Sequence, residues 1–472
     1  MTDRVTLFTA AEAADAVGGA LVGEASALIE SVVVDSRKAE PLSLFIALPG
    51  EKVDGHAYIA ASLGAGSSCV FARADHRAVV EAEYLALARA KGAALVFVPD
   101  ALAALQSLAA SYRRRFPRLV RIGITGSSGK TTTKECIASI FALSRHVVLN
   151  PGNLNSDIGL PLSVFSIRRE HEVGVFEMGM NRKGEMGELA AVYEPDIALI
   201  TNIGTAHIGI LGSRDAIAEE KKKIFSHFDG NQSGFVWEDD DYNAFLKSGV
   251  RGEVFDFGPR RTVGLHVVRD CGLSGYDLEW RGRTFRFPLP GRHNLADAIG
   301  ALAVASRAGV SDEDIARGLA SVKPLFGRSE ILEGEYTILR DCYNANPDSV
   351  AAAIGLCDEA QWNGRRVYVL GTMLELGNES ESAHRAMGER AGRSAADALF
   401  FFGVESRSAF EAARLAGFRG LCFFETDIDR LLAALRAYLK KGDLVLLKAS
   451  RGMALERIAD ALMPPSGEAA KD

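Results

Sequence analysis

The sequence lacks paired cysteines and has no segment suited to a membrane. Its cysteines stand far apart, and none forms a Cys-x-x-Cys pair of the kind used for zinc binding or redox chemistry, so we expect free thiols. Nowhere do about 18 apolar residues run together, and Met1–Val5 do not begin an apolar signal segment. These absences predict a cytoplasmic protein without membrane insertion.

A strongly basic surface is also absent. The formal net charge is −7, and the dense basic runs, Arg113–Arg115 and Lys221–Lys223, are short. Runs of this length are typical of solvated helix surfaces, where we expect both to lie. The charge balance therefore disfavours nucleic acid as the main partner.

With 472 residues, the chain is long enough for about three domains, and its pattern changes twice. Residues 1–98 predict a small α/β domain. Residues 99–326 alternate short apolar runs with long helical stretches, which predicts a central parallel-sheet domain, with an antiparallel excursion over 234–290. Residues 327–472 predict a doubly wound, Rossmann-like domain with a disordered tail from 464. We therefore expect an α/β fold of three domains.

A phosphate-binding loop follows the apolar run that ends at Ile122. Residues 123–133 read Gly-Ile-Thr-Gly-Ser-Ser-Gly-Lys-Thr-Thr-Thr and precede a helical stretch, which is the strand–loop–helix setting that such a loop requires. The glycines let backbone N–H groups point at one anion, Lys130 reaches the outer phosphates and the Thr131 hydroxyl can bind Mg²⁺. The sequence thus predicts a nucleoside triphosphate bound by Gly126, Ser127, Ser128, Gly129, Lys130, Thr131 and Thr132.

Two polar residues follow apolar runs where strands of a parallel sheet would end. Glu177 comes directly after Val173–Phe176, and His207 closes a loop that begins after Ile200. Ligands collect at the carboxyl ends of such strands, so both side chains would face the crevice of the phosphate loop and hold Mg²⁺ there. A loop histidine with a purely structural role is the alternative.

Lys221 lies on the apolar stripe of a predicted helix, in register with Ile217 and Ile224, so it points inward while its two lysine neighbours point outward. A buried lysine favours the neutral amine, which can take up CO₂ as a carbamate. A lysine that extends its ammonium to the surface is the alternative.

These motifs together resemble the Mur ligase family, whose members are ATP-dependent amide-forming enzymes of peptidoglycan precursor synthesis. The resemblance covers nearly the whole chain and rests on Gly126–Thr132, Glu177–Gly179, Asn202–His207, Lys221–Ile224 and Gly291–Asn294. It implies Mg²⁺ ligands at Thr131, Glu177 and His207, a carbamylated lysine at Lys221, and catalytic roles for Lys130, Lys221 and His207. It also implies nucleotide contacts from Asn294, Arg328 and Asp341.

Other segments are similar to the MurF branch, which joins D-alanyl-D-alanine to UDP-N-acetylmuramoyl-tripeptide through an acyl phosphate. The segments are Gly152–Pro161, Glu177–Glu185, Tyr343–Pro347, Val369–Gly377 and Ala449–Met453. The likeness implies a monomer with these two substrates as partners. It implies substrate contacts from Ser36, Arg37, Asp54, Gly55, His56, Asn153, Asn155, Asn344 and Asn346. Single departures from the family's pattern stand at Ser156, Asp297, Arg340, Thr372 and Ala449.

Three alternatives remain open from the sequence. Another branch of the same family would add diaminopimelate, lysine or glutamate. A phosphate-loop switch or motor ATPase would need an aspartate at the end of an apolar strand, where this chain has Glu177. A binding protein without activity on the same fold is the third alternative.

Overall fold

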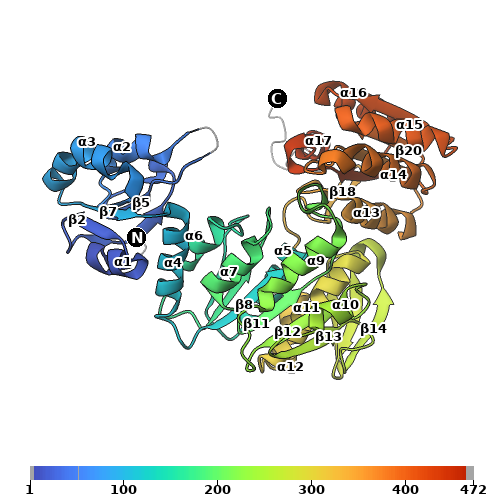
Figure 1. Cartoon of the computed structure of the whole chain (residues 1–472). Coiled ribbons are helices and arrows are strands. Elements are labelled where there is room, and N and C mark those ends of the chain that lie inside the picture. Colours follow the sequence, from blue (N-terminus) through green and yellow to red (C-terminus); the bar gives the residue numbers. More distant parts are fainter. Residues whose placement is uncertain (1–4, 51–52, 464–472) are drawn as a thin grey trace, which may run out of the picture. The chain divides into compact units, whose positions relative to one another are not determined.

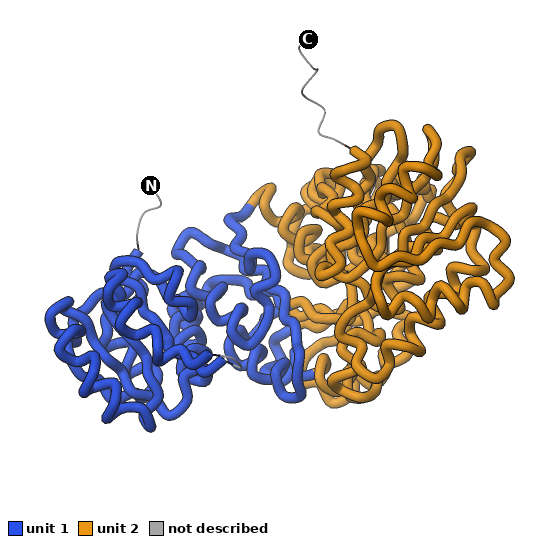
Figure 2. Tube along the Cα trace, turned by 90° about the horizontal axis from the view of Figure 1, so that it is seen from above, with its two compact units in different colours: residues 1–123, 145–197, 223–232 blue, residues 124–144, 198–222, 233–472 orange. Residues whose placement is uncertain are grey.

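The computed structural model describes residues 5–50 and 53–463, so the predicted disordered tail lies outside the described residues. The chain forms two compact units, which Figure 2 shows in different colours. Unit 1 comprises residues 1–123, 145–197 and 223–232, and unit 2 comprises residues 124–144, 198–222 and 233–472. No helix among the described residues has the length and apolar character needed to span a membrane.

The first sheet of unit 1 has five strands in the order β2-β7-β6-β5-β4 (Figure 1). The strands from β4 to β7 run parallel, and β2 pairs antiparallel with β7. A separate antiparallel pair joins β1 to β3. The elements are β1 (Phe8–Thr9), α1 (Ala10–Val17), β2 (Ala20–Gly23), β3 (Leu28–Ile29), β4 (Ser31–Val33), β5 (Ser43–Ile46), α2 (Ile59–Ala65), β6 (Cys69–Arg73), α3 (Arg77–Ala90) and β7 (Ala94–Val98).

Helix α4 (Ala101–Arg113) follows this sheet and contradicts one expectation. Arg113 is not on a solvated surface, because its side chain is only 3% exposed. Its guanidinium donates to Glu194 at 2.6 Å, and Glu194 also lies 3.8 Å from Arg121. A charge that is removed from water needs such a partner, so Arg113 contributes to folding, whereas Arg114 and Arg115 of the same run are exposed, as expected.

A six-stranded sheet in the order β13-β12-β11-β8-β10-β9 forms the centre of the chain. The expected antiparallel excursion over 234–290 is wrong in its first part, because β12 and β13 pair in parallel and extend this sheet. Within residues 234–290, only β14, β15 and β16 form an antiparallel sheet. The strands are β8 (Val120–Thr125), β9 (Val147–Leu149), β10 (Val173–Glu177), β11 (Ile197–Ile200), β12 (Ser233–Trp237), β13 (Glu253–Phe257), β14 (Leu265–Asp270), β15 (Tyr276–Trp280) and β16 (Arg283–Phe287).

The helices of this central region alternate with its strands, as the sequence predicted. The longest, α11, packs against α5, which begins at the phosphate loop, and α12 packs against α5 as well. The helices are α5 (Lys130–Phe141), α6 (Gly159–Val164), α7 (Glu185–Tyr193), α8 (Ile208–Leu211), α9 (Arg214–Lys222), α10 (Asn243–Lys247), α11 (Arg292–Arg307) and α12 (Asp312–Ala320).

The last sheet, in unit 2, has the order β17-β18-β22-β19-β20-β21 and is parallel except at its β17 edge. Alternate side chains of its strands enter two apolar cores, one shared with α13–α15 and one with α16 and α17. Burial on both faces confirms the doubly wound prediction. The elements are β17 (Glu330–Glu333), β18 (Thr337–Asp341), α13 (Pro347–Glu359), β19 (Arg366–Gly371), α14 (Ser380–Gly392), β20 (Ala398–Phe402), α15 (Arg407–Leu415), β21 (Leu421–Glu425), α16 (Ile428–Tyr438), β22 (Leu444–Lys448) and α17 (Glu456–Leu462).

Candidate active site

The phosphate loop connects β8 to α5, as the sequence predicted. Gly126 has φ +150°, and a Cβ there would lie 1.7 Å from the Thr201 hydroxyl, so the loop tolerates only glycine. Gly129, with φ +82°, precedes the first residue of α5. The N–H groups of the first helical turn therefore follow directly on the loop, in the arrangement that binds phosphate.

The loop after β11 supports the phosphate loop within unit 2. The Ser127 N–H donates to the Asn202 carbonyl at 3.0 Å, and the Ser128 N–H donates to the Asn202 side-chain oxygen at 3.2 Å. The Thr201 hydroxyl donates to the Ser128 carbonyl at 2.5 Å. The sequence predicted a site role for His207 of this loop but none for Thr201 or Asn202, although Asn202 belongs to the segment Asn202–His207 that carries the family resemblance. Their position between β11 and His207 was the available signal.

Two lysines converge on the phosphate loop. The Nζ atoms of Lys130 and Lys221 donate to the same carbonyl oxygen, that of Gly126, at 2.8 Å and 3.0 Å. Lys221 is 1% exposed, so the surface alternative is wrong and the inward orientation is confirmed. Burial, followed by the positive charge of Lys130, holds the pKa of Lys221 well below its usual range. Lys221 therefore favours the neutral amine.

His207 lies in unit 2 with the two lysines. Burial and the charges of Lys130 and Lys221 lower the pKa of His207 to about 3, so the imidazole is neutral at physiological pH. Its Nδ1 is buried and has no hydrogen-bond partner among residues 5–50 and 53–463. A neutral ring with an unengaged nitrogen fits a metal ligand. Thr131, the second predicted ligand in this unit, lies half-buried in the first turn of α5.

Glu177, the third predicted metal ligand, belongs to unit 1. It ends β10, is 2% exposed, and accepts a hydrogen bond from the Asn155 amide at 3.3 Å. Asn150, which sequence reasoning missed, accepts from the Glu177 N–H at 2.9 Å and donates to the Glu177 carbonyl at 3.1 Å. The Asn153 carbonyl accepts from the Asn155 N–H at 2.8 Å. The two predicted substrate residues thus form one loop beside Glu177.

The predicted nucleotide residues of unit 2 lie in the first turn of α11, in the bend before β17 and at the end of β18. The Asn294 amide donates to the Pro290 carbonyl at 2.7 Å, in the first turn of α11. The Arg328 guanidinium stacks 4.2 Å from the centre of the Tyr343 ring. Asp341 pairs with Lys448 at 2.7 Å, and this lysine also donates to the Asn344 carbonyl at 2.9 Å. Lys448 was missed, because nothing in the sequence of β22 pairs it with Asp341.

Asn346, a predicted substrate residue, is the N-cap of α13. Its side chain caps α13 by accepting from the Ser349 N–H at 2.8 Å, while the Ser349 hydroxyl accepts from the Asn346 N–H at 3.0 Å. The next residue but one, Asp348, accepts from both the N–H and the hydroxyl of Thr205 at 2.9 Å and 3.0 Å. The start of α13 therefore contacts the loop that carries His207.

The predicted substrate residues between Ser36 and His56 belong to two short turns in unit 1. Asp35 caps the turn Ser36–Lys38 and pairs with Arg37 at 2.8 Å. Asp54 lies 2.6 Å from His56 Nδ1, and His56 Nε2 accepts from the Arg73 N–H at 3.0 Å. Asp54, His56 and His76 lie close enough together to suggest a metal site. Both nitrogens of His56 are committed, however, so the group does not fit a metal.

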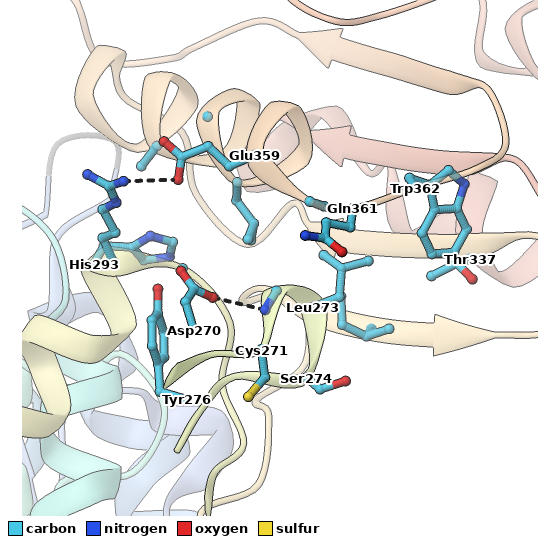
Figure 3. A pocket seen from close by; sticks show the side chains of 18 of the residues that line it. Asp270, Cys271, Leu273, Ser274, Tyr276, His293, Thr337, Glu359, Gln361 and Trp362 are labelled. Atoms are coloured by element: carbon cyan, nitrogen blue, oxygen red, sulfur yellow. Dashed lines mark hydrogen bonds and ion pairs between the residues drawn. The ribbon is translucent and has the colours of Figure 1, made fainter. Parts of the chain in front are cut away.

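A cavity of about 1140 Å³ lies elsewhere in unit 2, between the β14–β16 sheet and α13 (Figure 3). Tyr276, His293 and Trp362 line it, and the ion pair between Arg292 and Glu359 borders it at 3.4 Å. None of the predicted site residues lines this cavity. It is therefore distinct from the phosphate loop.

The phosphate loop, the neutral histidine and the parallel sheets define the class: a phosphate-loop nucleotide-binding protein of the α/β type. Comparison with protein families refines it. Residues 28–113 match the Mur ligase family catalytic domain, residues 124–305 the Mur ligase middle domain, and residues 327–451 the Mur ligase glutamate ligase domain. The chain belongs to the Mur ligase family.

Individual relatives agree with this assignment. UDP-N-acetylmuramoyl-tripeptide–D-alanyl-D-alanine ligase of Treponema pallidum is 46% identical, over 96% of this chain and 98% of its own. The enzyme of the same name from Bacillus subtilis is 35% identical over 92% and 93%. MurF from Acinetobacter baumannii superposes with a TM-score of 0.85 at 30% identity, covering 97% of this chain and 98% of its own. MurF from Thermotoga maritima in complex with ADP gives 0.77 at 28% identity, over 91% and 96%. The three-domain α/β prediction is confirmed.

Proposed function

We propose that the protein is an ATP-dependent ligase that joins D-alanyl-D-alanine to UDP-N-acetylmuramoyl-tripeptide. The observation that carries the proposal is the 46% identity, over nearly the full length of both chains, to the Treponema pallidum enzyme of that name. The phosphate loop and its two converging lysines supply the ATP chemistry that such a ligase needs. The proposed domain bounds are 1–98 for the UDP-muramoyl peptide, 99–326 for ATP and 327–472 for the ligase domain.

The chain's own residues can perform the first half of the reaction. Gly126–Thr132 would hold the phosphates of ATP, and Lys130 would neutralise charge on the phosphoryl group as the tripeptide carboxylate takes it up. The product of that step is an acyl phosphate. Mg²⁺, held by Thr131, Glu177 and His207, would neutralise phosphate charge. Because His207 is neutral, it would bring a lone pair and no charge to that site.

In the second half the amine of D-alanyl-D-alanine attacks the acyl carbon, the C–N bond forms and phosphate leaves. Water would destroy the intermediate, so the site must exclude it while the amine approaches.

We assign ATP contacts to Asn294, Arg328 and Asp341. We assign substrate contacts to Ser36, Arg37, Asp54, Gly55, His56, Asn153, Asn155, Asn344 and Asn346. A carbamate on Lys221, a monomeric state and a cytoplasmic location complete the proposal.

The direct test is to incubate the purified protein with ATP, Mg²⁺, UDP-N-acetylmuramoyl-tripeptide and one acceptor at a time. We expect a product whose mass equals the tripeptide nucleotide plus D-alanyl-D-alanine, with release of one phosphate per product. Diaminopimelate, lysine and glutamate, offered with the shorter muramoyl precursors, serve as competing acceptors. A product with one of these and none with the dipeptide would move the protein to another branch. ATP hydrolysis without any ligated product would favour a switch ATPase.

A further inference from the structure

A buried carboxyl group lies directly beneath the phosphate loop. Asp297 belongs to the first half of α11, the helix that packs against α5, and it is only 5% exposed. Helix α5 begins at Lys130, so the loop that would receive the phosphates of ATP rests on the helix that carries this acid. Asp297 has no role in the ligase reaction proposed for this protein.

The contacts of Asp297 are with the loop and the first turns of α5. A Cβ on Gly129 would lie 2.1 Å from Asp297 Oδ1, so the carboxyl group touches the loop where its backbone turns into the helix. The same Oδ1 accepts a hydrogen bond from the Thr133 hydroxyl at 3.2 Å. Asp297 Oδ2 is buried and has no hydrogen-bond partner within the described part of the chain. Among the described residues, the Thr133 hydroxyl is thus the hydrogen-bond donor that supports this acid.

One hydroxyl donor is poor compensation for a buried negative charge. Burial raises the pKa of Asp297 well above its usual value, and the Thr133 hydrogen bond, Arg328 and Lys130 oppose that rise only in part. The positive charges that act on the Asp297 carboxyl group are those of Arg328, in the segment before β17, and Lys130, at the start of α5. Burial, followed by the charge of Asp297, raises the pKa of the Cys136 thiol of α5. Among the described residues, α12, α13, β12 and β13, which also pack against α11, add no charged group that acts on Asp297.

The ionised and neutral forms differ in what they do to an anion site. A neutral carboxylic acid fills the space under Gly129 without adding charge. An ionised one places a negative charge against a loop whose purpose is to hold phosphates, and in a buried setting that repulsion is weakly screened. The neutral form dominates below the raised pKa, and the charge appears as the pH rises through it. ATP affinity should therefore fall as the pH rises.

We propose that Asp297 is a positioning residue that supports the phosphate loop as a neutral carboxylic acid, and that its ionisation sets an upper pH limit on ATP binding. The proton released on ionisation goes to solvent. The inference rests on the proposed function in one respect, namely that the loop binds ATP.

The test compares the wild type with Asp297→Asn, which keeps the shape of the side chain and cannot ionise. The dissociation constant of Mg·ATP is measured calorimetrically for both proteins from about pH 5 to about pH 9. Taking the ratio of wild type to variant cancels the titration of ATP itself. We expect a ratio near unity at the acid end that rises to about tenfold at the alkaline end. A ratio that is constant across the range would overturn the proposal.

A second pair of variants tests the same idea from the side of the hydrogen bond. Thr133→Val removes the donor that favours the ionised form, so the loss of ATP affinity should begin at a higher pH than in the wild type. Thr133→Ser keeps the hydroxyl and should follow the wild-type profile. If the three profiles coincide, Asp297 does not control the pH dependence.

The proposed function and the role of Asp297 are refuted by different results. A wild-type protein that binds no Mg·ATP at any pH would refute the proposed function and this inference with it. A protein that binds ATP and forms the ligated product, but shows the same pH profile with Asp297 and with asparagine, would refute the inference alone.

Discussion

Lys130 and Lys221 share one hydrogen-bond acceptor, since both Nζ atoms donate to the carbonyl oxygen of Gly126, at 2.8 Å and 3.0 Å. Two ammonium groups so close together repel each other, and only Lys221 is fully buried. The arrangement of lower free energy is therefore a charged Lys130 and a neutral Lys221. This division gives each lysine its own task, and each can be tested separately.

Lys130→Ala should lower kcat/KM by on the order of 10³-fold, because the charged amine neutralises the phosphoryl group in the transition state. Product formation is followed by mass. The thermal midpoint should stay close to that of the wild type, since the side chain serves the phosphate site and is not part of an apolar core. Near-normal turnover by a folded variant would mean that the loop has another role.

Lys221→Ala should lose most activity if the neutral amine carries a carbamate. A short carboxylic acid that enters the vacated space should restore part of that activity. An independent readout is the carbamate signal in a ¹³C spectrum of protein equilibrated with labelled CO₂, which the variant should lack.

Lys222→Ala is the matched control for Lys221, because Lys222 is less buried and donates to the carbonyls of Phe245 and Ser248, away from the phosphate loop. Its activity and its labelled spectrum should match those of the wild type. Full activity in Lys221→Ala, or a labelled spectrum without a carbamate signal, would leave Lys221 as a structural lysine.

His207 should make the folded state sensitive to acid. Its pKa falls from 6.5 to about 3 on folding, so the stability that its neutral ring contributes is fully present above about pH 6.5. That contribution is lost as the pH falls toward 3, with a slope of at most about 1.4 kcal/mol per pH unit.

His207→Gln removes this titration, so the thermal midpoint of the wild type should fall relative to that of the variant between about pH 6.5 and about pH 4. A difference between the two midpoints that does not change with pH would show that folding does not lower the pKa of His207. The apparent affinity for Mg²⁺ should also be weaker in the variant.

Asp348→Ala should loosen the loop that carries His207, because Asp348 accepts from both the N–H and the hydroxyl of Thr205. Losing these bonds removes about 1–3 kcal/mol from the local opening free energy. Hydrogen exchange of the amides from 204 to 211 should quicken by at least about fivefold, and kcat should fall. Glu359→Ala, at the far end of α13, is the control and should leave that exchange unchanged. Unaltered exchange in Asp348→Ala would refute the link.

Local sequence was enough to predict much of the site. The glycine spacing, Lys130 and the flanking elements defined the phosphate loop, because such loops are specified by contiguous residues. The apolar stripe of α9 gave the inward direction of Lys221, because helical periodicity is also local.

Tertiary structure decided which distant residues meet. The direction of β12 and β13 depends on which strand each one joins, and the antiparallel expectation was wrong because β-rich composition carries no direction. Likewise, only folding reveals that Glu194 neutralises the buried Arg113 and that Lys448 pairs with Asp341. The sequence alone thus determined the chemical groups of the site and their helices and strands, since these follow from neighbours in the chain. Apart from the inward direction of Lys221, the environment of each group was decided by burial and by partners far along the chain, which no local pattern encodes.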